Sequence, residues 1–245
     1  MTDTNIREVP MDVFEVFLDG FGGFEVSMSN DKYDEIITLL ENHQIPDEYP
    51  ERTRSQEYPQ FMNMELDNNS TYYRSRIIHN SCFPFLAKKW IEPLAKWIGR
   101  RKVLEVMAGS GALSKSLKEC GVNIKPTDIY ENDYFMSYDW GNKLWCDVEQ
   151  ISANDAIEKY GKEVDIIIMS WPPYQTSDAH DTLIKMREIN PDCIMLYIGE
   201  SQGGCTADDD FFTIAEFFED PEFEEEVGSN YRSSYGIHDR LYIVG

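Results

Sequence analysis

The chain of 245 residues carries 45 acidic and 22 basic side chains, a formal net charge of −23, with 42% hydrophobic and 13% aromatic residues. That composition excludes a disordered polyelectrolyte and predicts one large α/β core, or one core with an elaborated extension. A protein that grips a nucleic-acid backbone displaces counterions with lysine and arginine, so this charge disfavours nucleic acid and favours small molecules or basic partners.

Signals for membranes, secretion and metals are missing from the sequence. No apolar run approaches the roughly 20 residues that cross a bilayer, and the first residues lack a basic stretch followed by an apolar one. The five cysteines are scattered, and the four histidines show no ligand spacing. We therefore expect a cytoplasmic protein with reduced thiols, no membrane segment and no metal. The oligomeric state is left open.

Residues 1–98 form an N-terminal extension with helical and loop-rich parts. The apolar spacing predicts a short helix over 33–41 and a longer one over 83–98, in which Pro93 must start a new turn or introduce a kink. Because this extension directly precedes the first predicted strand of the core at 99–245, we expect it to include a lid over the substrate crevice.

From residue 102 the chain alternates between strand-like and helix-like segments, which is typical of a parallel sheet covered by helices on both faces. Strands are predicted at 102–107, 122–127, 143–146, 164–169, 193–198, 223–228 and 239–244. Helices are predicted at 113–120, 151–160, 179–189 and 208–218. The expected architecture is an α/β fold with a Rossmann-like, seven-stranded, mostly parallel sheet and a mainly helical N-terminal extension.

The segment from Val103 to Gly111 is the most informative part of the chain. Apolar residues around Glu105 predict a buried strand with a carboxylate near its exit, and Gly109-x-Gly111 lets the backbone turn sharply and approach a ligand. The helix predicted next completes a strand, a glycine turn and a helix. This succession is the ligand-cradling corner of a Rossmann-like sheet.

Polar residues also follow other predicted strands. Asp128 lies 19 residues after Gly109, close to the roughly 20-residue offset of a ribose-binding acid. Asp147 follows the expected third strand, where it could accept a hydrogen bond from an exocyclic amine. The run Ser170–Tyr174 follows the strand at 164–169. Because the carboxyl ends of parallel strands line one crevice, we expect these residues to face a bound molecule.

With these motifs, residues 100–245 resemble the class I S-adenosylmethionine-dependent methyltransferases, whose seven-stranded sheet ends in an antiparallel strand. The resemblance implies S-adenosyl-L-methionine as cofactor. Its methionine portion would lie on the glycine turn near Glu105, its ribose on Asp128, and its adenine on Asp147 and Val148. The implied cofactor-binding residues are Glu105, Met107, Ala108, Gly109, Gly111, Asp128, Ile129, Asp147, Val148 and Ser170.

The run Trp171-Pro172-Pro173-Tyr174 resembles the Pro-Pro-aromatic motif of amino methyltransferases. In that family a polar residue stands in place of Trp171 and accepts a hydrogen bond from the substrate amine, which an indole cannot do. Ser170 could serve from one position earlier, although strand alternation turns its side chain the other way. The implied catalytic residues are Trp171, Pro172, Tyr174 and Ser170.

Two positions in the glycine turn and its helix depart from related patterns. Met107 replaces the first glycine of the family's Gly-x-Gly-x-Gly, a change that still leaves a usable turn. Ser114 stands where a dinucleotide-binding turn needs its third glycine, which weakens a nicotinamide interpretation.

Two further groups could border the site, with purely structural roles as the alternative for both. One group is Tyr72, Tyr73, Arg74 and Arg76, where an arginine would suit the cofactor's carboxylate. The other group is Glu200, Ser201 and Cys205, which follow the fifth predicted strand and could form a substrate rim.

The pattern as a whole favours a methyltransferase that acts on an amine of a small molecule or a basic protein. One alternative is a catalytically silent protein of this fold that binds a basic partner through its acidic surface, such as 208–226 with its ten acids and five phenylalanines. Another is a nucleic-acid adenine or cytosine amino methyltransferase. Its basic patch would be Lys88, Lys89, Lys96, Arg100, Arg101 and Lys102.

Overall fold

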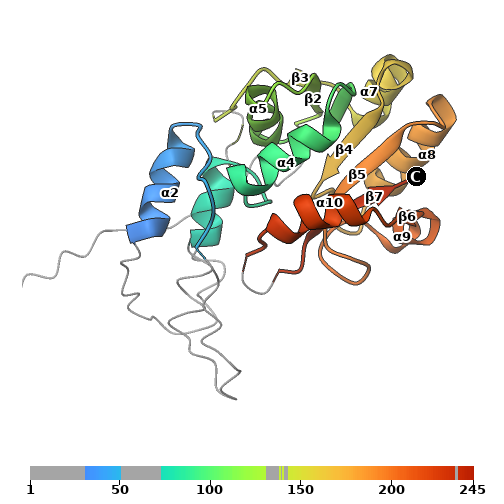
Figure 1. Ribbon diagram of the computed structural model, residues 1–245. Coiled ribbons are helices and arrows are strands. Elements are labelled where there is room, and N and C mark those ends of the chain that lie inside the picture. Colours follow the sequence, from blue (N-terminus) through green and yellow to red (C-terminus); the bar gives the residue numbers. More distant parts are fainter. Residues whose placement is uncertain (1–30, 51–72, 131–137, 139, 141–142, 235–236) are drawn as a thin grey trace, which may run out of the picture.

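The computed structural model describes residues 31–50, 73–130, 138, 140, 143–234 and 237–245. Within them one sheet runs in the order β3-β2-β1-β4-β5-β7-β6 (Figure 1). The strands are β1 (Val103–Val106), β2 (Ile124–Asp128), β3 (Glu149–Gln150), β4 (Ile166–Ser170), β5 (Ile194–Gly199), β6 (Phe217–Phe218) and β7 (Arg240–Val244). β1 to β5 pair in parallel, and β7 is antiparallel to β5 and β6. The predicted seven-stranded, mostly parallel Rossmann-like sheet is confirmed.

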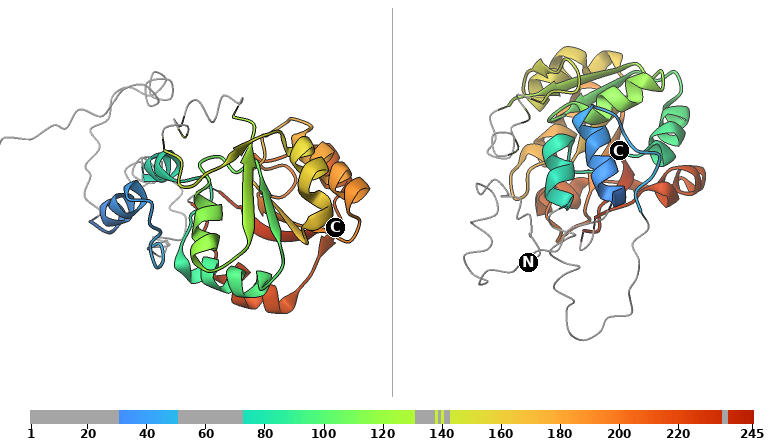
Figure 2. Two further views of the ribbon diagram at one scale, coloured as in Figure 1. Left: turned by 90° about the horizontal axis from the view of Figure 1, so that it is seen from above. Right: turned by 90° about the vertical axis from the view of Figure 1, so that its left-hand side faces the viewer.

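Helices cover both faces of this sheet, as Figures 1 and 2 show. One layer holds α4 (Lys88–Ile98), α5 (Ala112–Glu119) and α10 (Pro221–Glu226). The other holds α7 (Ala153–Tyr160), α8 (Asp178–Ile189) and α9 (Asp209–Ile214). Each of these helices overlaps a predicted helix except α10, which lies where a strand was expected.

The apolar run of β4 explains why two layers form. Ile166 and Ile168 belong to the buried cluster under α4 and α5, whereas Ile167 and Met169 belong to the cluster under α7 and α8. Successive side chains of a strand point to opposite faces, so a strand that is covered on both sides must be apolar at nearly every position. The sequence of this strand therefore predicts its central place in the sheet.

The described part of the N-terminal extension lies in two places. α2 (Asp31–Glu41) and the helical segment 73–80 sit together beyond one end of the sheet (Figure 2), while α4 packs on a sheet face. The helix expected at 33–41 is confirmed. The one expected at 83–98 begins only at Lys88, because the chain is extended at Ala87, and it continues through Pro93. The division into extension and core at residue 98 stays a prediction.

The strand expected at 143–146 is wrong. The third strand is β3, which pairs with the end of β2, and the preceding segment crosses the glycine turn as a loop. The loop is held there by Trp145, whose backbone N–H donates to Ser110 O at 2.8 Å and whose indole Nε1 donates to Asn80 O at 2.8 Å. These tertiary bonds replace the ladder bonds of a strand.

The C-terminal part differs from prediction in two elements. Residues expected as a strand at 223–228 form α10, because Asp220 caps the backbone N–H of Phe223 at 3.1 Å and Pro221 starts the first turn. The predicted helix from Asp208 begins as expected, with that side chain capping its N-terminus, but it ends at Ile214. Phe218 accordingly lies in edge strand β6 instead of on the helix.

No helix among the described residues combines the length and the apolar character that crossing a bilayer requires. All five cysteines are free thiols. In the same described ranges, no three His, Cys, Asp or Glu side chains gather as a potential metal site.

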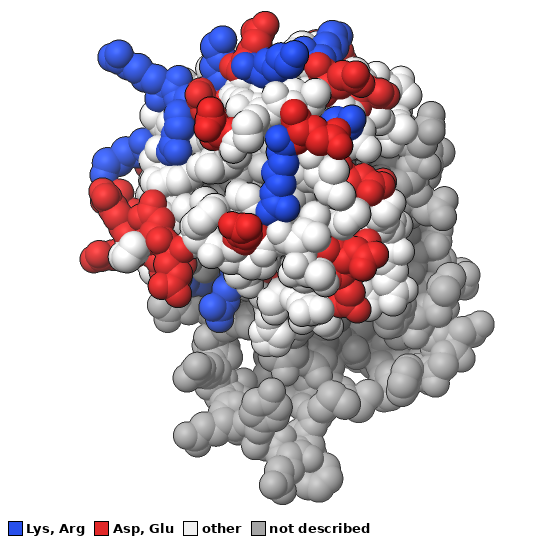
Figure 3. Space-filling view, turned by 90° about the vertical axis from the view of Figure 1, so that its right-hand side faces the viewer, with Lys and Arg blue, Asp and Glu red and all other residues white. Residues whose placement is uncertain are grey.

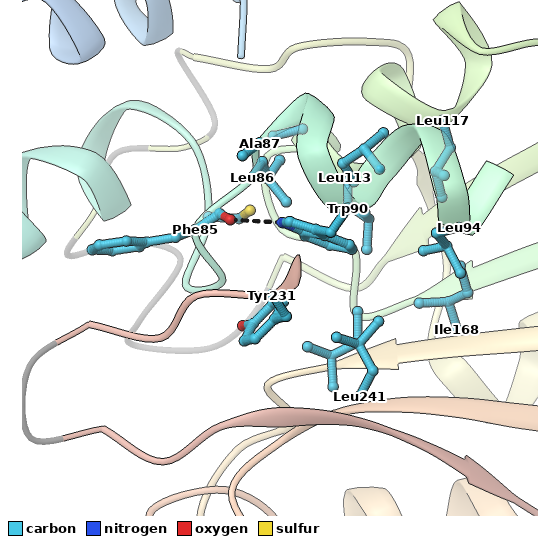
Figure 4. Close-up of a cluster of buried hydrophobic side chains, with 14 of the residues drawn as sticks. Phe85, Leu86, Ala87, Trp90, Leu94, Leu113, Leu117, Ile168, Tyr231 and Leu241 are labelled. Atoms are coloured by element: carbon cyan, nitrogen blue, oxygen red, sulfur yellow. Dashed lines mark hydrogen bonds between the residues drawn. The ribbon is translucent and has the colours of Figure 1, made fainter. Parts of the chain in front are cut away.

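The core between α4 and the sheet is built around one tryptophan (Figure 4). The Trp90 side chain is fully buried, its indole Nε1 donates to Phe85 O at 2.9 Å, and its ring meets Tyr231 edge-on at 5.2 Å. Figure 4 also shows Leu94 and Ile168 beside this cluster. The indole thus joins the N-terminal helix, the sheet and the C-terminal segment.

Replacement of Trp90 should destabilise the whole fold. We expect Trp90→Ala to lower the free energy of unfolding by about 3–5 kcal/mol, because a large buried ring leaves a cavity. Trp90→Phe should cost less, since it mainly removes the donor from Phe85 O. Urea denaturation followed by circular dichroism measures both. Ile184→Ala on the partly exposed face of α8 is the control, and an equal loss there would contradict this account.

Candidate active site

A cavity of about 230 Å³ opens at the carboxyl ends of β1, β2 and β4. After β1 the chain builds β2 and β3 on one side, and then crosses to place β4 on the other side of β1. Ligands of open α/β sheets bind outside the carboxyl ends of the strands at such a switch point. The strand order therefore makes this cavity the candidate ligand-binding site.

The glycine turn forms the floor of the cavity through Met107, Ala108 and Gly109, with Gly111 just beyond it. Met107, Gly109 and Gly111 all have positive φ, of 54°, 54° and 73°. A left-handed conformation costs a non-glycine residue about 1–2 kcal/mol, so Met107 is a strained position whose partly buried side chain packs against the α7 layer. A Cβ on Gly111 would lie 2.7 Å from Val148 Cγ2, so this turn also needs its glycine for packing.

Asp128 ends β2 and is joined to the glycine turn. Its Oδ2 accepts the N–H of Gly109 at 2.7 Å, and its Oδ1 accepts the N–H of Tyr130 at 2.8 Å. Burial raises the pKa of the carboxyl, and the backbone N–H bonds oppose that rise. An ionised carboxylate offers about four acceptor positions, so Asp128 keeps acceptor capacity for a hydroxyl group of a ligand.

Glu105 lies under the glycine turn, 1% exposed, and borders the cavity. The Ser114 hydroxyl donates to its Oε2. Burial raises the pKa of this carboxyl, the bond from Ser114 lowers it, and the negative charge of Asp128 raises it, which together bring it from an ordinary 4.5 to about 7. The acid therefore titrates closer to neutral pH than an exposed glutamate does.

The buried acid makes folding stability depend on pH. The pKa of Glu105 is higher in the folded chain than in the unfolded chain, so stability should fall as pH rises from about 4.5 to about 7. Glu105→Gln removes this loss. We expect the melting temperature of the variant to exceed that of the wild type at pH 8, with the difference shrinking toward pH 5.5. Exposed Glu163→Gln is the control, and a pH-independent difference for Glu105→Gln would refute the assignment.

The Pro-Pro turn after β4 forms the wall opposite Asp128. Trp171 has φ 51°, so the chain leaves strand conformation there, and both Ser170 and Trp171 border the cavity despite their expected alternation. The indole Nε1 of Trp171 donates to Asp239 Oδ2 at 3.0 Å. Its ring stacks on Phe83 at 5.0 Å. The Ser170 Oγ is shielded from solvent and has no hydrogen-bond partner among the described residues.

The N-terminal extension supplies a further wall through Arg74, Cys82, Phe83 and Pro84. Of the three described residues in the group expected to close over the site, Arg74 alone borders the cavity. Tyr73 is buried, Tyr72 lies outside the described residues, and Arg76 pairs with Asp34 and Glu41 on α2. The lid predicted in the extension remains a prediction, but part of the extension does border the crevice.

Four expected cofactor contacts lie outside the cavity lining, namely Gly111, Ile129, Asp147 and Val148. Ile129 is 39% exposed, and Asp147 is exposed and precedes β3 instead of following a third strand. On the expected substrate rim, Cys205 borders the cavity. Glu200 instead joins two loops by accepting the N–H groups of Cys205 and His238, each at 2.8 Å.

Aromatic residues of the lining were missed. Phe83 meets Tyr138 and Trp140 edge-on at 5.5 Å each, and those two rings stack at 5.4 Å. Trp140 lies so close to Gly109 that a Cβ there would be 2.9 Å from the indole. Cys82, Pro84 and Leu113 complete the missed lining. In the sequence, the cluster of aromatic residues at 138–145 was the one indication that this segment lines a site. These residues match no motif spacing, so the sequence did not predict them as lining residues.

The chain resembles known proteins in fold but not in sequence. No protein-family model matches the chain, and no curated protein matches it in sequence. The structure is similar to TehB from Haemophilus influenzae, with 14% identity over 72% of this chain and 66% of that protein and a TM-score of 0.40.

Two other solved structures show the same level of likeness. One is a SAM-dependent methyltransferase from Bacteroides fragilis in complex with S-adenosyl-L-homocysteine, with 14% identity, 63% and 76% coverage and a TM-score of 0.36. The other is an O-methyltransferase family protein from Burkholderia thailandensis, with 9% identity, 75% and 62% coverage and a TM-score of 0.39. At these scores the likeness concerns the fold alone.

Proposed function

We propose that this chain is an S-adenosylmethionine-dependent methyltransferase that methylates an amine of a small molecule or a protein. The observation that carries the proposal is the meeting of three features at one cavity: the glycine turn, Asp128 and the Pro-Pro turn. Each follows a different strand, and the cavity lies at the topological switch point, where a Rossmann-like sheet binds its ligand. The antiparallel final strand β7 agrees with the family resemblance.

The residues present suit the cofactor at its methionine and ribose ends. Asp128 keeps acceptor capacity for a ribose hydroxyl, and the glycine turn leaves room for close approach of a ligand. The cavity of about 230 Å³ is smaller than the roughly 300 Å³ at which drug-sized sites begin. The described walls therefore enclose part of the molecule, and Ile129, Asp147 and Val148 outside them remain candidates for the adenine end.

The chain's own contribution to the chemistry would be positioning. When bound, S-adenosylmethionine supplies an activated methyl group, so the protein has to hold the acceptor nitrogen in line with it, an effect worth on the order of 7–11 kcal/mol in favourable cases. The rings of Trp171 and Tyr174 would confine the acceptor and keep water out. The indole N–H of Trp171 is engaged by Asp239, which holds the ring in place.

Nucleic acid is disfavoured as a substrate by the pairing of the expected basic patch. Lys88 pairs with Asp47 at 2.7 Å, Lys89 with Glu48 at 2.5 Å and Lys96 with Glu226 at 3.0 Å. On the face shown in Figure 3, basic side chains gather toward the top of the view but are interspersed with acidic ones. Three of the six cations of this patch are therefore already paired with carboxylates, which reduces the charge that can displace counterions from phosphates.

Calorimetric titration with S-adenosylmethionine and S-adenosylhomocysteine tests cofactor binding. We expect micromolar binding of both, weakened at least tenfold in Asp128→Asn because charge-assisted hydrogen bonds to the ribose are lost. Exposed Asp192→Asn is the matched control, and a thermal melt checks that each variant is folded. Binding that is absent in the folded wild type would refute the proposal.

Methyl turnover separates the enzyme from a catalytically silent protein of the same fold. With aniline, benzylamine and a lysine-rich peptide as acceptors, we expect radiolabelled methyl transfer to at least one, and Tyr174→Ala should lower kcat/KM at least tenfold. Ile184→Ala, away from the cavity, should leave it unchanged. Cofactor binding without transfer to any acceptor would favour the silent protein, which binds a basic partner through its acidic surface.

A further inference from the structure

Arg74 is the only lysine or arginine among the described residues that border the cavity. It lies in the helical segment 73–80, with its guanidinium carbon 5.5 Å from the centre of the Trp171 ring. No carboxylate of the described residues lies within ion-pair distance of it, whereas Arg76, two positions later, pairs with Asp34 and Glu41. In a chain with 45 acids and 22 bases, an arginine that borders a cavity and forms no ion pair with a described residue is a candidate to bind an anionic ligand.

Its neighbours place Arg74 on the acceptor side of the cavity. Its charge acts on Cys205 after β5 and on Asp239 before β7, and it lies over Trp171 after β4. Asp128 ends β2, which is two strand positions from β4. At about 4.8 Å per position, the ends of these two strands are roughly 10 Å apart. Arg74 therefore lies on the Trp171 side of the cavity, away from the expected ribose contact.

The surfaces beside Arg74 are flat and apolar. Phe83 and Trp171 stack with an interplanar angle of 12°, and Pro172, Pro173 and Tyr174 continue the wall. Planar rings pack best against such faces. A guanidinium binds a carboxylate or phosphate through two parallel hydrogen bonds and also stacks on aromatic faces. The combination suits a planar molecule with an anionic group.

We propose that the methyl acceptor is an aromatic amine that carries an acidic group, a carboxylate or phosphate, and that Arg74 binds this group. The proposal rests on the methyltransferase function and specifies its substrate. The net charge of −23 has little influence inside the cavity, because salt screens exposed charges that lie more than about 8–10 Å away. At contact distance, Arg74 is the one cation that the described lining offers to an anionic group.

Binding of three matched probes tests the proposal. The probes are 4-aminobenzoate, neutral 4-aminobenzamide and cationic 4-aminobenzylamine, titrated by saturation-transfer NMR into the full chain saturated with S-adenosylhomocysteine. We expect 4-aminobenzoate to bind at least tenfold more tightly than the other two, and 4-aminophenyl phosphate to behave like it. Arg74→Gln should abolish the preference. Arg76→Gln, whose partners lie on α2, should retain it.

A preference for the amide or the benzylamine would overturn the proposal, as would anionic probes that fail to bind or that bind Arg74→Gln equally well. A second titration separates the acceptor's anion from the cofactor's carboxylate. If Arg74→Gln weakens S-adenosylhomocysteine but not 5′-methylthioadenosine, which lacks that carboxylate, Arg74 serves the cofactor and the proposal is wrong. Failure of the methyltransferase function itself has a different signature, namely a wild type that does not bind S-adenosylhomocysteine.

Discussion

The cavity depends on how the backbone at the end of the helical segment 73–80 is satisfied. Trp140 Nε1 donates to Ile78 O at 2.9 Å, and Trp145 Nε1 donates to Asn80 O at 2.8 Å. The Ser110 hydroxyl of the glycine turn donates to Ser81 O. The last carbonyls of a helix have no partner within it, and a buried carbonyl left without a donor costs about 1–3 kcal/mol. These bonds hold the N-terminal wall against the glycine turn.

Buried acids set the electrostatics around the site. Burial raises the pKa of Glu105, Asp128 and Asp239, and each is stabilised by neutral donors: a serine hydroxyl, backbone N–H groups, and the indole and phenol of Trp171 and Tyr231. Neutral donors satisfy a carboxylate without cancelling its charge. The site thus holds buried acids under the glycine turn, and Arg74 is the cation that the described lining places on the opposite side.

Much of the scaffold follows from local pattern, and the exceptions have local causes. The continuous apolar run of β4 and the glycines at 109 and 111 predicted a buried strand and a sharp turn, and both are present. The strand expected at 223–228 failed because Asp220 and Pro221 are helix-starting residues that outweigh the apolar spacing. The strand expected at 143–146 forms six residues later, at Glu149–Gln150, and the adenine contacts expected at Asp147 and Val148 stay a prediction.

The sequence by itself determined the fold class, the glycine turn, Asp128 and the Pro-Pro turn, because periodicity and glycine act on the conformation of the residues that carry them. Tertiary structure alone decided which distant side chains meet at the cavity. Arg74 and Phe83 contact Trp171 although both lie far from it in the sequence. Trp171 has a left-handed backbone conformation, and its side chain is held by contacts with Phe83 and Asp239. Such contacts depend on which distant side chains the folded chain brings together. A local sequence pattern does not encode that choice.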